Sequence, residues 1–299
     1  MALARFAVFG HPIAHSLSPR IHQAFSQQFG IELEFRTIDA SPDTFEAAVR
    51  QFFNDGGTGA NVTVPHKHAA FALAAERSIS AARVGAANVL SCLPDGRLVA
   101  HNTDGVCLVR DLIERQQLDL NGCKVLMLGA GGAAWGVAWS LLDAGVRSLT
   151  IANRTTSAAD KLVNALGDPQ RARACRLDAL ADAGRFDLIV NATSAGLLGH
   201  ALDLPLSLGG PEVFCYDVSY AKAALPFLAW ARATGARHAV DGLSMLVETA
   251  ADSFALWHGR APVTEPVFQQ LRSHLAEPSH ESTTAPVQPA ARYPSFSFT

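Results

Sequence analysis

Residues 124–136, KVLMLGAGGAAWG, decide the fold. An apolar run predicts a strand that ends at Gly129, and Gly131 and Gly132 then lead into a second apolar run that predicts a helix. The pattern is close to GxGxxA, with Ala134 in its third place, and indicates the first turn of a Rossmann-like domain. Glycines are needed there because the backbone must approach a pyrophosphate, while the helix N-terminus offers N–H groups and a positive dipole. A glycine-rich tight turn without a ligand is the alternative.

The run 125–142 is also long and uncharged enough to raise the question of a membrane span. We interpret it as a buried strand, a glycine turn and a buried helix, because Asp143 and Gly145 close it.

The stretch IANRTTSAADK, which begins at Ile151, bears on the choice of cofactor. An NAD-binding domain usually carries an acidic residue about 20 residues after the glycines, where it accepts a hydrogen bond from the ribose 2′-hydroxyl. Asn153, Arg154 and Thr155 stand at that place instead. Arg154 cannot accept a hydrogen bond, but its guanidinium suits a 2′-phosphate, so the sequence favours NADP over NAD. The alternative is that Arg154 is a solvated surface charge.

Short apolar runs alternate with helical segments along the chain, which predicts βαβ units and an α/β fold with mostly parallel sheets. Strands are expected at 5–10, 33–38, 59–64, 124–129, 148–153, 186–192 and 213–218. Helices are expected at about 19–29, 42–53, 67–76, 105–116, 132–144, 156–166, 225–234, 243–258 and 264–275. Residues 87–101 predict a hairpin that turns at Pro94, Asp95 and Gly96.

Two domains are expected, with boundaries near residues 104 and 240. Residues 105–239 form the Rossmann-like domain, and the last helices return to the first domain, which therefore comprises 1–104 plus 240–276. The tail 277–299 is rich in Pro, Ser and Thr and is predicted to be disordered.

Composition excludes several classes of function. A net charge of −3 over 299 residues gives no electrostatic footprint for nucleic acid or an anionic membrane. The five cysteines are scattered and lack a CxxC pair, which favours reduced thiols in a cytoplasmic protein. The N-terminus shows no long apolar run before Gly10, so no signal peptide is expected. Several histidines lie near the first loops, but none has a metal-ligand spacing, so no metal is expected.

A lysine follows the predicted strand in GANVTVPHKHAA, residues 59–70. Asn61 and Thr63 lie two residues apart, so a strand points both side chains to one face. Pro65 ends the strand, and Lys67 begins the next helix. Because ligands bind at the C-terminal ends of parallel strands, Lys67 either contacts a ligand or extends into solvent.

Asp104, in the stretch AHNTDGVCLVRDL, is a candidate partner for this lysine. Its structural role would be a helix N-cap. Its functional role would be to hold Lys67 protonated and oriented, so that the two residues form a general acid.

Two serines stand after the first strand, in FGHPIAHSLSPRIH. Ser18 is expected to cap the next helix, with Pro19 as its first residue. Hydroxyls at a helix N-terminus also suit a carboxylate or polyol, and Ser16 has no capping role to explain it.

Nine stretches resemble the motifs of the shikimate dehydrogenase family, in order. They are VFGHPIAHSLSPRIH, GANVTVPHK, GAANVL, HNTDG, LGAGGAA, NRT, NATSAG, YDVSY and DGLSMLVETAADSFALWHG, and they extend from about residue 5 to 260. The resemblance implies NADPH-dependent reduction of 3-dehydroshikimate to shikimate, on the route to chorismate and the aromatic amino acids. It also implies an N-terminal substrate domain, a Rossmann-like NADP-binding domain, a cleft between them, and a monomer or homodimer.

The resemblance also implies roles for single residues. Lys67 and Asp104 would be the catalytic pair. Substrate would be bound by Ser16, Ser18, Thr63, Asn88, Asp104, Tyr220 and Thr249. NADP would be bound by Gly129, Ala130, Gly131, Gly132, Ala133, Asn153, Arg154 and Thr155, with Val218 and Gly242 near the nicotinamide.

Three positions depart from the usual family pattern. Thr249 stands where a glutamine is usual and is shorter, so it is expected to reach substrate only through water. Ala158 stands where many relatives carry a second arginine, which weakens the expected NADP preference. His11 replaces a common asparagine.

Three alternatives stay open at this point. A quinate/shikimate dehydrogenase that uses NAD has the same fold, although Arg154 and Ser18 speak against it. A folate-interconverting dehydrogenase has a similar architecture, but HSLSP and NTDG do not suit it. A non-catalytic ligand sensor would bind without turnover and would not need a proton donor.

Overall fold

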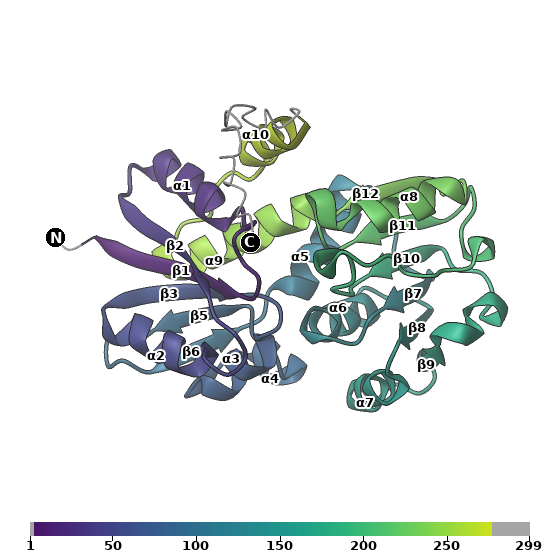
Figure 1. Cartoon of the computed structure of the whole chain (residues 1–299), viewed down its shortest axis with the longest axis horizontal. Coiled ribbons are helices and arrows are strands. Elements are labelled where there is room, and N and C mark those ends of the chain that lie inside the picture. The colour runs from purple at the N-terminus through teal and green to yellow at the C-terminus, as the bar shows by residue number, and fades with distance from the viewer. Residues whose placement is uncertain (1–2, 277–299) are drawn as a thin grey trace, which may run out of the picture.

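The computed structural model describes residues 3–276, which form two lobes side by side, each built on a six-stranded sheet (Figure 1). The strands of the first lobe are β1 (Ala4–Gly10), β2 (Leu33–Asp39), β3 (Gly57–Val62), β4 (Glu76–Arg77), β5 (Val89–Cys92) and β6 (Leu98–His101). Those of the second lobe are β7 (Lys124–Leu128), β8 (Ser148–Asn153), β9 (Ala172–Arg176), β10 (Leu188–Asn191), β11 (Phe214–Asp217) and β12 (His238–Asp241).

The first sheet has the order β2-β1-β3-β5-β6-β4. Three of its five strand pairs are parallel, and the two pairs that involve β5 are antiparallel. The hairpin of β5 and β6 turns at the predicted place, which confirms that part of the sequence analysis. Apolar residues of β1 and β3 fill the core between this sheet and its helices.

The second sheet has the order β12-β11-β10-β7-β8-β9, and all its strand pairs are parallel. Strand order reverses between β7 and β10, so the first strand of the lobe lies at the switch point where such folds bind ligands. The predicted α/β class and the Rossmann-like arrangement are confirmed.

Helices cover both sheets. They are α1 (Ser18–Phe29), α2 (Phe45–Asn54), α3 (Lys67–Leu73), α4 (Ile79–Val84), α5 (Asp104–Arg110), α6 (Gly132–Asp143), α7 (Thr156–Leu166), α8 (Leu225–Ala233), α9 (Leu243–His258) and α10 (Glu265–Ala276). The chain enters the second lobe through α5 and leaves it through α9, and these two helices lie between the lobes (Figure 1).

The C-terminal helices return to the first lobe, as predicted. α9 and α10 pack against α1, and their buried apolar side chains form one cluster with Ile21 and Phe25. Phe254 of α9 is fully buried there. The domain boundaries near 104 and 240 stay a prediction, and the predicted disordered tail lies outside the described residues.

Some predicted elements differ from the structure. Helix 105–116 is an α-helix only to Arg110, and a π-helical turn (Asp111–Arg115) follows it. Helix 67–76 ends at Leu73, because Ala74 adopts an extended conformation. The short elements β4, α4, β9 and β12 were not predicted, since none of them contains a continuous apolar run like those of β7, β10 and β11.

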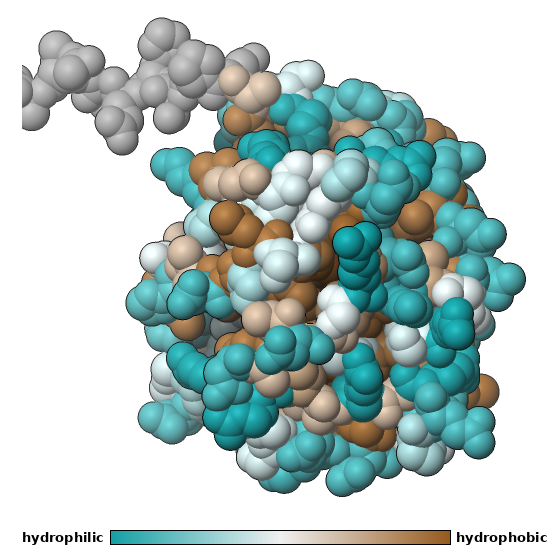
Figure 2. All heavy atoms as spheres, turned by 90° about the vertical axis from the view of Figure 1, so that its right-hand side faces the viewer, coloured by the Kyte–Doolittle hydropathy of each residue, from teal (hydrophilic) through white to brown (hydrophobic). Residues whose placement is uncertain are grey.

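The run 125–142 is strand β7, the glycine loop and most of α6, as interpreted. Within the described part of the chain, no helix is long and apolar enough to cross a membrane. Seen from the side of the second lobe, hydrophilic side chains cover much of the surface and apolar ones show between them (Figure 2). All five cysteines are free thiols.

Candidate active site

A cleft of about 840 Å³ is lined by residues of both lobes. It lies at the C-terminal ends of the parallel strands, since Val62 of β3, Leu128 of β7 and Ala152 of β8 all line it. Every candidate site residue from the sequence lines this cleft except Gly242. Gly242 caps α9 directly behind Val218, and Val218 does line the cleft.

Lys67 and Asp104 form an ion pair in this cleft. The Lys67 Nζ donates to Asp104 Oδ2 at 2.5 Å, and the two residues are only 8% and 4% exposed. Each is the first residue of its helix, α3 and α5, so two helix starts meet here. Withdrawal from water strengthens the attraction between the two charges but makes either charge costly on its own, so the two side chains are held in contact.

Two asparagines hold Asp104 in place. The Asn88 Nδ2 donates to Asp104 Oδ1 at 3.0 Å and to Thr103 Oγ1 at 2.9 Å, so both its amide hydrogens are in use. The Asn88 Oδ1 accepts from the Thr103 N–H at 2.9 Å. The Asn102 Oδ1 accepts from the Asp104 N–H at 3.2 Å. Asn88 is therefore left with one acceptor lone pair for a ligand.

The N-cap expected at Ser18 is wrong, and the N-cap considered as the structural alternative for Asp104 is not found. Thr103, not Asp104, stands at the N-cap of α5, because the Asp104 carboxylate is taken by Lys67 and Asn88. Leu17, not Ser18, stands at the N-cap of α1. The Ser18 N–H donates to Ser16 Oγ at 3.3 Å, which gives Ser16 a structural role and leaves both hydroxyls at the cleft.

Thr63, Tyr220 and Thr249 also line the cleft. Burial raises the pKa of the Tyr220 phenol, which therefore stays protonated at neutral pH. The Thr249 hydroxyl donates to the Leu246 carbonyl at 2.9 Å. It can therefore only accept a hydrogen bond from a ligand, whereas an amide side chain could also donate.

The glycine loop fits a pyrophosphate. Gly131 is the N-cap of α6, with no capping side chain and no acidic residue in the first turn, so free N–H groups face the cleft. A Cβ on Gly132 would lie 2.9 Å from the Lys67 Cβ, so only glycine leaves room for the lysine. The cofactor loop and the proposed proton donor are thus in contact.

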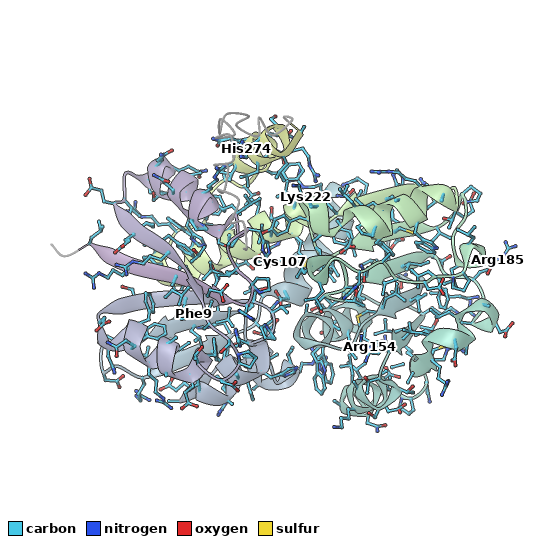
Figure 3. All side chains as sticks on the ribbon, in the orientation of Figure 1. Phe9, Cys107, Arg154, Arg185, Lys222 and His274 are labelled. Atoms are coloured by element: carbon cyan, nitrogen blue, oxygen red, sulfur yellow. The ribbon has the colours of Figure 1, made fainter. Side chains whose placement is uncertain are left out.

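Arg154 lines the cleft on an exposed loop after β8. Figure 3 places it on the side of the second lobe nearer the first, while Arg185 lies at the far side. Among the described residues, no carboxylate pairs with Arg154. The neighbouring Asn153 Nδ2 donates to the Thr155 carbonyl at 2.9 Å, which orders this loop.

The chain was compared with known families and proteins. Residues 8–90 match the model of the shikimate dehydrogenase substrate binding domain, and residues 111–198 match that of shikimate / quinate 5-dehydrogenase. The shikimate dehydrogenase (NADP(+)) of Xylella fastidiosa (strain M12) is 51% identical over 280 residues, which cover 93% of this chain and 99% of that relative. The chain belongs to the shikimate dehydrogenase family.

Solved structures agree with this family membership. An Ael1 enzyme from Pseudomonas putida matches with a TM-score of 0.79 and 46% identity, over 90% of this chain and 98% of that one. Shikimate 5-dehydrogenase from Thermus thermophilus, in complex with NADP(H) and shikimate, matches with a TM-score of 0.78 and 32% identity, over 91% of this chain and 99% of that one.

The sequence analysis did not single out every polar residue of the cleft. Thr193, Ser194 and Ser219 also line the cleft, from loops that follow β10 and β11. Each of them follows an apolar strand that ends in a polar residue, Asn191 or Asp217, and this position after a parallel strand could have indicated them. His11, which had no assigned role, donates through its Nδ1–H to Asp39 Oδ1 at 2.6 Å and does not line the cleft.

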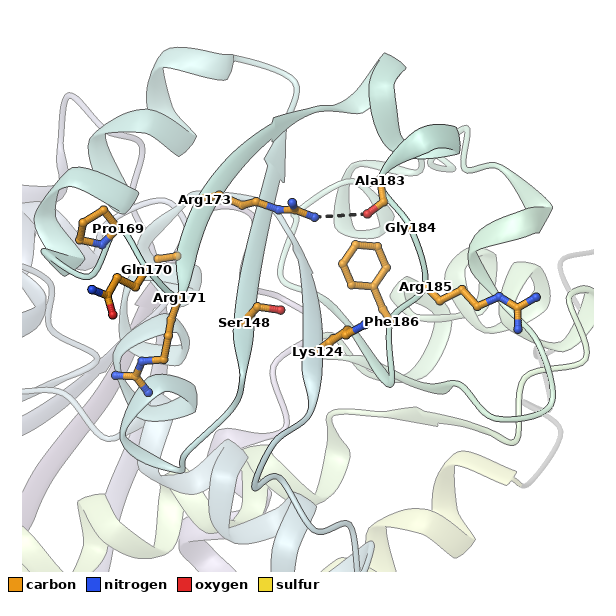
Figure 4. Close-up of a pocket in the computed structure, with 11 residues that line it drawn as sticks. Lys124, Ser148, Pro169, Gln170, Arg171, Arg173, Ala183, Gly184, Arg185 and Phe186 are labelled. Atoms are coloured by element: carbon orange, nitrogen blue, oxygen red, sulfur yellow. Dashed lines mark hydrogen bonds between the residues drawn. The ribbon is translucent and has the colours of Figure 1, made fainter.

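A smaller pocket of about 310 Å³ lies at the opposite end of the second sheet. Lys124 and three arginines line it, but the side chains do not converge, because Arg171 and Arg185 point outward in opposite directions (Figure 4). Arg173 is turned onto the Ala183 carbonyl, to which its Nη2 donates at 3.2 Å. This pocket is not a candidate active site. Within residues 3–276, no group of three or more His, Cys, Asp or Glu side chains is arranged to hold a metal.

The buried ion pair predicts strong coupling between its two members. We expect Lys67→Met to lower the free energy of unfolding by about 3 kcal/mol, because Asp104 is left charged and buried. The double variant Lys67→Met, Asp104→Asn should recover about 1–3 kcal/mol of the summed losses. Urea denaturation of the four proteins in the cycle measures this coupling.

The control is the exposed pair of Arg50 and Glu46, whose side chains are 61% and 65% exposed. Its coupling in the same cycle should stay below about 0.5 kcal/mol. If the losses in free energy of unfolding at Lys67 and Asp104 are simply additive, the two residues do not stabilise each other in solution, which contradicts a buried ion pair.

Proposed function

We propose that this protein is an NADP-dependent shikimate dehydrogenase that reduces 3-dehydroshikimate to shikimate. The observation that carries the proposal is the buried Lys67–Asp104 pair, which lies against the glycine loop in one cleft. A proton donor beside a dinucleotide cradle is what reduction of a ketone to an alcohol requires. The shikimate dehydrogenase (NADP(+)) of Xylella fastidiosa supports the same activity by its similarity.

NADPH, when bound, supplies hydride to the carbonyl carbon. Lys67 gives its proton to the carbonyl oxygen, so that no negative charge is left on it. Asp104 keeps Lys67 protonated before the step and aims its ammonium group at the oxygen. After the step, Lys67 is reprotonated from water that enters the open cleft.

The remaining residues of the substrate side orient the ring. Ser16 and Ser18 bind the carboxylate, through hydroxyls at the start of α1. Ring hydroxyls donate to the Asn88 Oδ1 and to the Asp104 carboxylate, which are already fixed by their own hydrogen bonds. Thr63, Tyr220 and Thr249 complete this side of the cleft. A ring held at several points presents one face of its ketone, so the product has a single configuration.

Residues of the second lobe bind the cofactor in this proposal. The N-terminus of α6, with Gly129, Ala130, Gly131, Gly132 and Ala133, binds the pyrophosphate. Arg154 binds the 2′-phosphate together with Asn153 and Thr155. Val218 lies at the nicotinamide end, with Gly242 behind it. The cytoplasmic location, the place on the route to aromatic amino acids, and a monomeric or homodimeric state stay predictions.

Specific activities test the proposal against its alternatives. Oxidation of shikimate and of quinate, each with NADP⁺ and with NAD⁺, is followed by the absorbance of the reduced nicotinamide. We expect the highest kcat/KM for shikimate with NADP⁺. A preference for quinate with NAD⁺ would favour the other branch of the family, and binding without turnover would show a ligand sensor.

Lys67→Ala tests the proton donor. We expect kcat to fall about 10²- to 10⁴-fold, because general acid catalysis contributes this much. The affinity for NADPH should change little, since the pyrophosphate is held by backbone groups of the glycine loop. NADPH fluorescence titration and steady-state kinetics measure the two quantities, and an unchanged kcat would remove Lys67 from the mechanism.

Arg154→Ala tests the cofactor assignment. We expect kcat/KM for NADP⁺ to fall about 10- to 100-fold, because charge-assisted hydrogen bonds to the 2′-phosphate are lost. The kcat/KM for NAD⁺, which lacks this phosphate, should stay unchanged. Arg185→Ala, at the far side of the same lobe, is the matched control and should affect neither cofactor. Equal losses with both cofactors would contradict a contact to the 2′-phosphate.

A further inference from the structure

Two loops form the second-lobe wall of the cleft near Tyr220. Residues 192–195 follow β10 and residues 218–220 follow β11, and all of them line the cleft. Beneath them, the last residues of the two strands, Asn191 and Asp217, lie side by side in the sheet. The mechanism above uses neither of these two residues.

Asn191 and Asp217 are joined by a buried hydrogen bond. The Asn191 Nδ2 donates to Asp217 Oδ2 at 2.8 Å, and the two residues are 4% and 0% exposed. Polar groups buried to this degree need partners, so their other atoms are also bonded.

Each residue of this pair holds one of the two loops. The Asp217 Oδ1 accepts from the Ser219 N–H at 2.7 Å, in the residue just before Tyr220. The Asn191 Oδ1 accepts from the Thr193 Oγ1 hydroxyl at 2.8 Å and from the Thr193 N–H at 3.2 Å. The donor and acceptor of each of these hydrogen bonds are fixed, because the Asp217 carboxylate only accepts and the Asn191 amide must turn its oxygen toward Thr193.

The two loops also touch each other. A Cβ on Gly196 would lie 1.8 Å from the Ala223 carbonyl oxygen, so the turns after β10 and β11 are in direct contact. Ala221, next to Tyr220, has a φ of 53° that a non-glycine residue rarely adopts. Such a conformation persists only where the surroundings fix it, so the backbone at Tyr220 is held rather than free.

Burial raises the pKa of Asp217 to about 6, while the bonds from Ser219 and Asn191 act in the opposite direction. The carboxylate is therefore mostly ionised at neutral pH, and its two donors are needed to compensate the buried charge.

We propose that Asp217 and Asn191 are positioning residues, which hold the two loops in register so that Tyr220 and Val218 meet substrate and nicotinamide in the reactive geometry. This role rests on the proposed function, since it concerns the same cleft. Neither side chain touches a ligand itself, and both act through the loops that they hold.

The fixed direction of the hydrogen bonds gives a sharp test by exchange of the two side chains. Asp217→Asn alone leaves one oxygen for two donors, so its NH₂ group faces either the Asn191 NH₂ or the Ser219 N–H. Asn191→Asp alone places two carboxylates face to face. In the double variant the amide at position 217 donates to the carboxylate at position 191. The carboxylate at position 191 also accepts hydrogen bonds from the Thr193 N–H and hydroxyl. The Ser219 N–H donates to the amide oxygen at position 217.

We expect each single variant to lower kcat/KM for shikimate about 10- to 100-fold and to weaken NADPH binding. The double variant should recover to within about fivefold of the natural protein, because all the bonds are restored. Asp187→Asn is the matched control, because Asp187 accepts from the Lys124 N–H at the opposite end of the second sheet, just before β10. It should leave both quantities unchanged.

A purely structural role would lower the melting temperature of the single variants but leave kcat, KM and NADPH affinity of the folded protein as they are. That result, or a double variant no better than the worse single one, would overturn the proposal. If a single variant does not fold, Thr193→Val removes one hydroxyl bond and leaves the central bond intact, and it should give a smaller loss of the same kind. If the natural protein itself does not oxidise shikimate, the proposed function fails, while loss and recovery of NADPH affinity still test the pair.

Discussion

The ion pair of Lys67 and Asp104 is the constraint on which the rest of the site depends. Two charges that are almost fully withdrawn from water are stable only when they stay in contact, so the starts of α3 and α5 must remain within a few ångströms of each other. Asn88 and Asn102 serve this same end, because they hold the side chain and the backbone of Asp104. The proposed proton donation by Lys67 and the local stability of the first lobe therefore depend on the same bonds.

This constraint extends to the second lobe through α5 and α6. α5 begins at Asp104, packs along α6, and carries the chain out of the first lobe, while α6 begins at the glycine loop. Because Gly132 contacts the stem of Lys67, a shift of the cofactor loop cannot leave the lysine where it is. The packing of α5 against α6 therefore fixes the position of Lys67 relative to the glycine loop.

The sequence predicted most of what is encoded locally, and it also suggested one distant contact, between Lys67 and Asp104, which the structure shows. The apolar strands, the glycine loop and Arg154 could be recognised because each signal is contained in one short stretch. The N-cap expected at Ser18 was wrong, because the Ser16 hydroxyl, two residues earlier, accepts from the Ser18 N–H. The N-cap role considered for Asp104 is not found, because its carboxylate is bound by Lys67, 37 residues away in the sequence. Strands β9 and β12 are edge strands of few residues, and their pairing rather than their composition makes them strands.

Lys67, Asn191 and Asp217 show why the residues of a site cannot all be assigned from one sequence. All three are polar residues at or just beyond the end of an apolar strand, so the same pattern predicts all three to lie at the ligand edge of a parallel sheet. Only the fold separates them. The Lys67 ammonium group faces the cleft beside a carboxylate, while Asn191 and Asp217 turn toward each other beneath it and expose only the loops that they hold. A polar strand end thus contributes either a reacting group or the support beneath one, and the position of its hydrogen-bond partner decides which.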